Sequence, residues 1–496
     1  MKSPLAPARN GLAIRRGAVP LLPIEALQEA LVHHVAAGGR VAAMFGVATD
    51  PLEIWAVVAD PETATLWLGR SRTERLPSLT PRLPQVHLYE RELAEQLGVV
   101  VEGHPWLKPV RFAPPLRPVS GNRPEIGQMD FFHIEGDEVH EVAVGPVHAG
   151  VIEPGHFRFQ CHGEQVLHLE ISLGYQHRGV ERALIGGPDK RALHLIETLA
   201  GDSTIAHASA YCGIIEGLAG ISAPPRAMAL RGVALELERL ANHTGDLGAL
   251  SGDVGYQPTA SFCGRLRGDW LNLSAQLCGN RFGRSLLRPG GLNVQVDDDR
   301  AHAMLPKIDA AMADLRPSMQ LLWDTPSVMS RFEETGVVSA HTARSLGLVG
   351  PAARASGLDR DARVEFPSGI YLYEQLLMST WTSGDVFARA RVRATEIERS
   401  ADFVHQRLSS LPTGPGLSEL GPLAPDQVCV SLVEGWRGEV VHAGLTDAKG
   451  RFAAYKIIDP SFHNWMGLAM ALRGQAISDF PLCNKSFNLS YCGFDL

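Results

Sequence analysis

Residues 226–246 read RAMALRGVALELERLANHTGD, and this stretch decides the fold of the larger part of the chain. Its apolar side chains recur at helical spacing, which predicts a long helix with one face turned to a core. A second long helix is predicted over 386–411, where Asp385 is a suitable N-cap. In the first helix the apolar positions are Leu230, Val233, Ala234, Leu237, Leu240 and Ala241, and the other faces hold Arg231, Glu236, Glu238, Arg239 and Asn242.

Short strand patterns lie on both sides of these two helices. EVHEVAVGPVHAG (138–150) and HFRFQCHGEQVLHLEISLG (156–174) are closed by glycine turns. VCVSLVEGW (428–436), GEVVHAGLTD (438–447) and RFAAYKIID (451–459) follow the second helix. The larger part is therefore predicted to be mostly helical, with small sheets at both ends.

The N-terminal part has a different pattern. Two helical stretches, IEALQEALVHHVAAGG and YERELAEQLG, flank the short apolar runs VAAMFGVA, EIWAVVA and TLWLGR. A segment rich in proline, glycine and charge, from 105 to 137, then breaks the periodicity and reads as a connection. We expect an α+β protein with a small α+β domain over 1–125 and a mostly helical domain over 126–496.

Composition excludes several functions. The 496 residues are 45% hydrophobic and 20% charged, with a formal charge of -8, and lysine and arginine are scattered, so no nucleic-acid partner is expected. No window approaches the roughly 18 to 20 consecutive apolar residues of a spanning helix, so membrane association is expected through partner proteins. The basic N-terminal stretch lacks the apolar core of a signal peptide, so secretion is not expected.

Cysteine usage and motif absences narrow the chemistry. The seven cysteines are widely spaced without any CxxC, which indicates reduced thiols in the cytoplasm and assigns no iron–sulfur cluster to this chain. GxxxxGKS/T and GxGxxG are missing, so nucleotide binding is not predicted. HExxH and GxSxG are missing as well, which leaves a redox or binding role.

A series of motifs then resembles one family, in that family's order. GPVHAG resembles GPxHP, GYQHRGVER resembles GYxHRGxEK, PPRAMALRGVALELERLANH resembles PxRAxxxRxxxxELxRxxSH, GPAARASGLDRDAR resembles GPxLRASGxxxDxR, EGWRGE resembles EAPRGE, and DPSFHN resembles PSFxN. These motifs belong to the large subunit shared by respiratory NADH dehydrogenase, formate hydrogenlyase and energy-converting NiFe hydrogenases. The resemblance runs from about Glu138 to Leu496. YERELAEQLGVVVEGHPWL resembles a motif of the neighbouring small subunit, so the chain resembles a fusion of the two.

The hydrogenase branch of this family holds nickel through two CxxC pairs, because soft thiolates suit that metal. ETLAGDSTIAHASAY (197–211) resembles ERxCGxCxxxHxxAY, with Ala200 and Ser203 at the cysteine positions. In SFNLSYCGFDL (486–496) the second pair falls on Ser490 and Gly493, with Cys492 between them. No metal ligand and no nickel are therefore expected in this chain.

In the quinone-reducing branch the vacated nickel cavity serves as the pocket for the quinone headgroup. His148 matches the histidine of that branch that contacts the quinone, and Asp253 falls on the aspartate that pairs with it. The branch's tyrosine, which donates to the other quinone carbonyl, falls on Gly201, and the closing arginine falls on Leu496. The resemblance thus implies a quinone cofactor with one of its two headgroup donors missing.

The candidate site residues each have a plainer alternative. The resemblance implies catalytic roles for His148, Asp253 and His207, and a cavity lined by His148, Gly201, Ser203, Ser490 and Cys492. His148 is equally consistent with a loop histidine bonded to backbone, Asp253 with an exposed turn residue, His207 with a packed helix residue, and Cys492 with a small buried apolar group. His177, Arg178, Arg226, Arg231, Arg354 and Arg437 are expected near the partner's cluster or at its interface, with structural ion pairs as the alternative.

Three hypotheses follow. The first is an electron-transfer subunit that receives electrons from a 4Fe-4S cluster in a small partner subunit and passes them to a quinone-type acceptor, coupled to membrane-embedded pumping subunits at the inner face of the cell membrane. The second is a catalytically silent scaffold that docks the cluster subunit onto the membrane arm. The third, an active NiFe hydrogenase, needs ligands that this chain lacks. The sequence does not specify the electron donor, whether NADH or formate.

Overall fold

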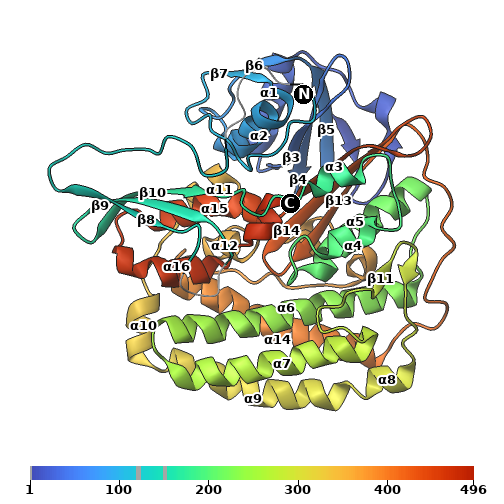
Figure 1. Cartoon of the computed structure of the whole chain (residues 1–496). Helices are drawn as coiled ribbons and strands as arrows, with labels where there is room; N and C mark the ends of the chain where they lie inside the picture. Colours follow the sequence, from blue (N-terminus) through green and yellow to red (C-terminus); the bar gives the residue numbers. More distant parts are fainter. Residues whose placement is uncertain (1–2, 119–124, 149–152) are drawn as a thin grey trace.

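The computed structural model describes residues 3–118, 125–148 and 153–496. Its N-terminal part is an antiparallel four-stranded sheet in the order β1 (Ala6–Ala8), β5 (Thr65–Arg72), β4 (Glu53–Asp60), β3 (Arg40–Val47). Helix α1 (Ile24–Ala36) packs against β3, β4 and β5, and α2 (His87–Leu97) packs against β3. Strands β6 (Arg75–Pro77) and β7 (Val100–Glu102) form a parallel pair beside them. Figure 1 shows this part in blue, at the top of the molecule.

A second four-stranded sheet joins the two parts of the chain. Its order is β15 (Phe452–Ile458), β14 (Gly438–Thr446), β13 (Gln427–Gly435), β2 (Ile14–Arg15), so the N-terminal strand β2 completes a sheet made by the C-terminal third. β15 also packs against β3 of the first sheet. Strand β2 comes from the N-terminal part but pairs with C-terminal strands, so the sheet order does not divide the chain at one residue. The domain boundary expected near residue 125 stays a prediction.

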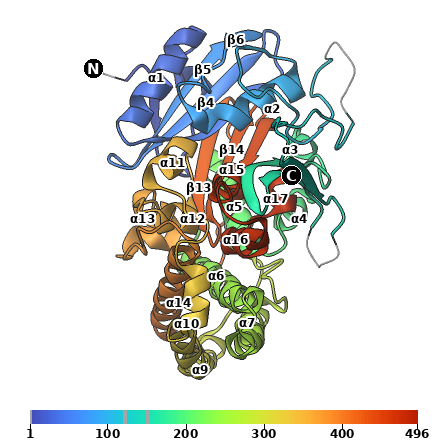
Figure 2. The ribbon, with the colours of Figure 1, turned by 90° about the vertical axis from the view of Figure 1, so that its left-hand side faces the viewer.

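Long helices form the body of the molecule. α6 (Pro225–Asp253), α7 (Gln257–Cys278), α9 (Leu305–Trp323) and α14 (Val386–Ser409) lie side by side in the lower part of Figures 1 and 2. The expected apolar face of α6 is buried, as predicted from its spacing. Asp385 caps α14, since its Oδ1 accepts a hydrogen bond of 2.7 Å from Ala388 N.

The middle of the molecule holds the elements that carry the family motifs. α5 (Thr204–Ala219) packs on β13 and β14, and α15 (Pro460–Ala471), α16 (Phe480–Phe487) and α17 (Tyr491–Asp495) fold back between the sheet and the helices (Figure 2). A three-stranded sheet, β10 (Gln165–Ser172), β9 (His156–His162), β8 (Val139–Val144), contacts α15 through β10.

The remaining elements are short. They are α3 (Val180–Leu184), α4 (Ala192–Glu197), α8 (Asp298–His302), α10 (Pro326–Phe332), α11 (Ala340–Leu346), α12 (Gly350–Ala355), α13 (Ala362–Glu365), the β11 (Leu287–Arg288) and β12 (Gly291–Leu292) hairpin, and 3-10 turns at Arg16–Ala18, Pro84–Val86, Gly369–Tyr373 and Ile477–Asp479. The expected α+β class, with a small sheet-containing part before a mostly helical one, is confirmed. Among the described residues, no helix combines the length and apolar character that a membrane crossing requires.

Candidate functional site

The two segments that resemble nickel-binding motifs meet in space. The guanidinium of Arg178 joins them: it donates to Thr198 O (2.6 Å) and Leu199 O (2.8 Å) in one segment and to Cys492 O (3.3 Å) in the other. Three carbonyl acceptors on one planar donor group fix the distance between the segments. The two segments therefore lie side by side, and the cavity that the resemblance implied between them stays a prediction.

The four nickel-ligand positions hold groups that are satisfied by the protein itself. Ser490 caps α17, since its Oγ accepts a hydrogen bond of 2.9 Å from Gly493 N. Ser203 Oγ accepts one of 3.2 Å from Arg437, and Ala200 is buried and apolar. A Cβ added to Gly493 would lie 2.6 Å from Asp459 Oδ2 and 2.8 Å from Ser490 Oγ, closer than real Cβ contacts.

These residues do not fit a nickel centre. Alanine and glycine offer no donor atom, both serine hydroxyls are engaged, and the carboxylate of Asp459 stands where a side chain at 493 would project. Across residues 3–118, 125–148 and 153–496, no cluster of three or more His, Cys, Asp or Glu side chains is arranged to hold a metal ion. A side chain at position 493 would thus meet a steric conflict in addition to the missing thiolates, and a nickel-free chain stays a prediction.

Asp459 begins a buried hydrogen-bonded chain that includes the predicted residue His207. Asp459 Oδ2 lies 3.1 Å from His207 Nε2, His207 Nδ1 lies 3.2 Å from His442 Nε2, and His442 Nδ1 lies 2.8 Å from the hydroxyl of Tyr455. Burial alone would raise the pKa of Asp459, but the hydrogen bond and charge of His207 bring it below its ordinary value. Burial and His207 hold the pKa of His442 well below the ordinary value. His207 is thus packed and bonded, as its plainer alternative predicted, and a catalytic role for it stays a prediction.

Arg437 lies beside Ser203, one of the four positions that correspond to nickel ligands. Its guanidinium pairs with both carboxylate oxygens of Asp202, at 2.6 and 2.7 Å, and donates to Asn488 O at 2.6 Å. The guanidinium also lies over the ring of Trp436, 4.0 Å from its centroid. Bidentate pairing and stacking orient an arginine rigidly. Arg437 is therefore held within the chain, and its expected contact with a cluster subunit stays a prediction.

Cys492 is paired with a residue that the sequence did not single out. Its thiol lies 3.3 Å from Glu153 Oε1, and its backbone N donates to Glu153 Oε2 at 2.7 Å. Burial and the charge of Glu153 raise the pKa of Cys492 to about 11, so the thiol stays protonated. Gln176 holds the same carboxylate through a hydrogen bond of 2.9 Å. The sequence could have drawn attention to Glu153, because this acidic residue lies a few residues after the GPVHAG motif.

His148, expected to contact a quinone, and Asp253, expected to pair with it, lie on separate elements. His148 follows β8, and its Nε2 is 3.0 Å from Gly155 O, the backbone contact of the plainer alternative. Asp253 ends α6 with an exposed side chain, yet the surrounding protein limits its hydration and raises its pKa to about 6, an effect that Lys485 partly offsets. A hydrogen bond or ion pair between His148 and Asp253 is not seen in the described part of the chain. Their pairing therefore stays a prediction.

The other expected interface residues are engaged within the chain. His177 Nδ1 lies 2.7 Å from Asp495 O. Arg231 pairs with Glu216 at 2.7 Å, and Arg226 pairs with Asp298 at 2.7 Å while donating to two backbone carbonyls. These contacts match the alternative of structural ion pairs. A role for any of them toward a partner subunit stays a prediction.

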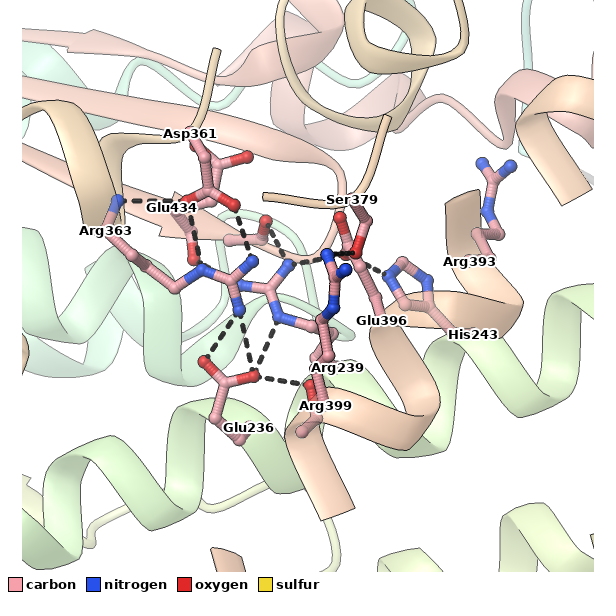
Figure 3. A network of polar contacts seen from close by, with 12 residues as sticks. Glu236, Arg239, His243, Asp361, Arg363, Ser379, Arg393, Glu396, Arg399 and Glu434 are labelled. Atoms are coloured by element: carbon pink, nitrogen blue, oxygen red, sulfur yellow. Dashed lines mark hydrogen bonds and ion pairs between the residues drawn. The ribbon is translucent and has the colours of Figure 1, made fainter. Parts of the chain in front are cut away.

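Arg354 belongs to a buried charge network that sequence patterns did not reveal. Figure 3 shows acidic, arginine and histidine side chains from α6, α14, β13 and the segment around α13 pointing toward one another. Arg354 pairs with Glu396 (2.5 Å) and Glu434 (2.7 Å), and Arg239 bonds to Glu236 (3.0 Å) and Glu396 (3.3 Å). Glu236 and Arg239 both belong to this network, and both are buried although they lie off the apolar face of α6. Buried charges persist where they are paired and hydrogen-bonded.

The ordered motifs that the chain carries are those of an oxidoreductase subunit of the hydrogenase and NADH dehydrogenase class. Residues 253–421 match the family model described as the respiratory-chain NADH dehydrogenase 49 kDa subunit, and residues 37–117 match that of the 30 kDa subunit. The chain is 30% identical to the carbon monoxide-induced hydrogenase of Rhodospirillum rubrum over 350 residues, which cover 70% of this chain and 97% of that protein. It belongs to this family of hydrogenase and NADH dehydrogenase large subunits, with a domain of the small-subunit type fused in front.

Two further relatives represent both branches of the family. The formate hydrogenlyase subunit 5 of Escherichia coli (strain K12) is 27% identical over 84% of this chain and 76% of its own length. An NADH-quinone oxidoreductase subunit from Solibacter usitatus is also 27% identical, over 68% of this chain and 91% of its own length. The recognition made from the ordered motifs is thereby confirmed. Because the identities to both branches are similar, the comparisons do not decide between hydrogenase and quinone chemistry, and the residues of the site have to.

Proposed function

We propose that this chain is the electron-transfer subunit of a membrane-associated, hydrogenase-like or NADH:quinone oxidoreductase-like complex that works without nickel. Electrons arrive from a 4Fe-4S cluster in a small partner subunit and leave on a quinone-type acceptor beside His148. The complex lies at the cytoplasmic face of the membrane, where pumping subunits hold it.

The observation that carries the proposal is the position of Asp459. Its carboxylate lies where a side chain at position 493 would project, and that carboxylate is bonded to the buried His207. This steric conflict with a cysteine at position 493 favours the quinone branch over the hydrogenase branch.

The test uses the complex purified with its partner subunits. Nickel content is measured together with quinone reduction by the wild type, by His148→Ala and by His162→Ala as a matched control. His162 lies on β9 of the same sheet, with an exposed side chain paired to Glu138. Nickel-free complex whose quinone reduction falls at least about ten-fold in His148→Ala alone would support the proposal. Stoichiometric nickel would overturn it.

A second candidate function is a silent scaffold that docks the cluster subunit onto the membrane arm. The observation that favours it is that the polar side chains of Ser203, Ser490 and Asp459 all form hydrogen bonds within the chain. Nickel-free complex with an intact cluster and no quinone reduction in any variant would favour the scaffold. Assembly of the complex would then fail when the chain is deleted.

A further inference from the structure

A cavity of about 590 Å³ lies between the small N-terminal part and the larger part of the chain. Its walls come from α2, the connecting segment after β7, β10 and α15, and none of the four nickel-ligand positions lines it. Pockets of about 300–1,000 Å³ suit small organic ligands. Most of the lining is apolar: Leu88, Trp106, Val110, Met129, Phe132, Ile134, Leu167, Leu169, Leu346, Trp465, Met466, Ala469 and Met470.

One cation on this wall, Arg91, forms no ion pair with any described residue. Arg91 donates through Nε to Lys108 O (2.8 Å) and through Nη2 to Pro109 O (2.7 Å). In the ranges that the structure describes, its guanidinium makes neither an ion pair nor a hydrogen bond through Nη1. Burial lowers the pKa of Arg91 to about 10, and the charges of Glu95 and Glu170 offset this in part. The group thus carries a positive charge that two carbonyls contact directly and that Glu95 and Glu170 stabilise without an ion pair.

The acidic residue on the wall is already engaged by other groups. Glu170 is buried, and its carboxylate already binds Lys108 Nζ at 2.9 Å and Phe132 N at 2.8 Å. Arg473, exposed on the α15 side, adds a second positive charge and lies 3.4 Å from His168 Nδ1. The cavity therefore combines an apolar interior with a net positive lining.

We propose that this cavity binds a single-chain amphiphile with an anionic head, of the fatty-acid type. The head would lie on the free edge of the Arg91 guanidinium, which suits carboxylate and phosphate oxygens. The chain would lie along the leucine, methionine and aromatic side chains, where burial of methylene groups is favourable. This site is separate from the proposed quinone pocket and does not depend on it.

The test is calorimetric titration of the full chain with monomeric dodecanoate, extended to octanoate, decanoate and tetradecanoate. Affinity is expected to rise about four-fold for each methylene that is buried. Arg91→Met is expected to weaken binding at least ten-fold. Arg182→Met is the matched control, because Arg182 also donates to carbonyls of the connecting segment, those of Pro114 and Pro115, but lines a different cavity.

A second variant tests the volume of the cavity independently of its charge. Ala469→Trp places an indole on the α15 wall and is expected to abolish binding, with thermal unfolding used to show that each variant is folded. The same titrations with phosphatidylglycerol vesicles separate a free amphiphile from a bilayer surface. Absence of dodecanoate binding, equal binding by Arg91→Met and wild type, or binding to vesicles alone would overturn the proposal.

Discussion

The carboxylate of Asp459 and the α-carbon of Gly493 are packed so closely that a Cβ at position 493 would lie 2.6 Å from Asp459 Oδ2. Asp459 also accepts from Ser461 N at 2.8 Å as the N-cap of α15 and bonds to His207. The carboxylate is thus held from two sides and cannot move away freely. The place where a side chain at position 493 would project is occupied by the carboxylate of Asp459, which the surrounding hydrogen bonds keep there.

Adding a methyl group at position 493 should therefore destabilise the protein, and removing the carboxylate should relieve the effect. Gly493→Ala is expected to cost about 1–3 kcal/mol, the usual range for overpacking. In the Asp459→Ala background the same substitution should cost less, giving a coupling energy above about 0.5 kcal/mol. Urea unfolding of the four proteins in the cycle measures both quantities.

The control for this cycle is Gly201→Ala. A Cβ at Gly201 would have Arg284 Nη2 as its nearest neighbour, at 3.6 Å, which is ordinary contact. Its effect on unfolding should stay within about 0.5 kcal/mol, in the range of substitutions without a specific structural cause. Equal costs for Gly493→Ala in both backgrounds would contradict the steric account.

The sequence predicted the parts of this site that depend on order along the chain. The apolar spacing of α6, the cap at Asp385 and the meeting of the two motif segments followed from local pattern and motif order. The partners of the buried charges did not, because Arg354 meets Glu434 across 80 positions and His207 meets Asp459 across 252. Such pairs are set by tertiary packing. Helical periodicity likewise placed Glu236 and Arg239 off the apolar face without revealing that both are buried.

Restoring the missing tyrosine should strengthen quinone binding if the proposed function holds. The space around Gly201 is open enough for a side chain to begin there. Gly201→Tyr is expected to lower the KM for a water-soluble quinone by about two- to ten-fold, since one hydrogen bond contributes about 0.5–1.5 kcal/mol. Gly201→Phe supplies the ring without the hydroxyl and serves as the control. Equal KM values for the two variants would argue against a hydroxyl contact.

Arg354 and Arg226 should respond very differently to the same substitution. Arg354 is fully buried between Glu396 and Glu434, so Arg354→Met leaves uncompensated carboxylates and is expected to cost about 3–5 kcal/mol. Arg226 pairs with the mostly exposed Asp298 and donates to two carbonyls, so Arg226→Met should cost about 1–2 kcal/mol. Urea unfolding separates the two, and a pull-down with the iron–sulfur subunit then tests the interface role. A folded Arg226→Met chain that retains full affinity for that subunit would remove Arg226 from the interface.

Glu238 should make the stability of this protein fall as pH rises. Its Oε2 accepts from Ile205 N at 2.7 Å and its Oε1 from Ala206 N at 3.3 Å, at the start of α5. Burial raises its pKa to about 8 in spite of these bonds, and Asp202 adds to the shift. The native state therefore binds this proton more tightly than the unfolded chain, in which the pKa is about 4.5.

Stability from this group is complete below pH of about 4.5 and is lost progressively up to pH of about 8. Glu238→Gln keeps an oxygen acceptor for the two amides and does not titrate. The variant should therefore gain on the wild type as pH rises, by up to about 1.4 kcal/mol per pH unit inside that window, with no further gain above it. Urea unfolding at a series of pH values gives the difference directly. A difference that is flat from pH 5 to 8, or that shrinks as pH rises, would show that Glu238 is already ionised in the native protein.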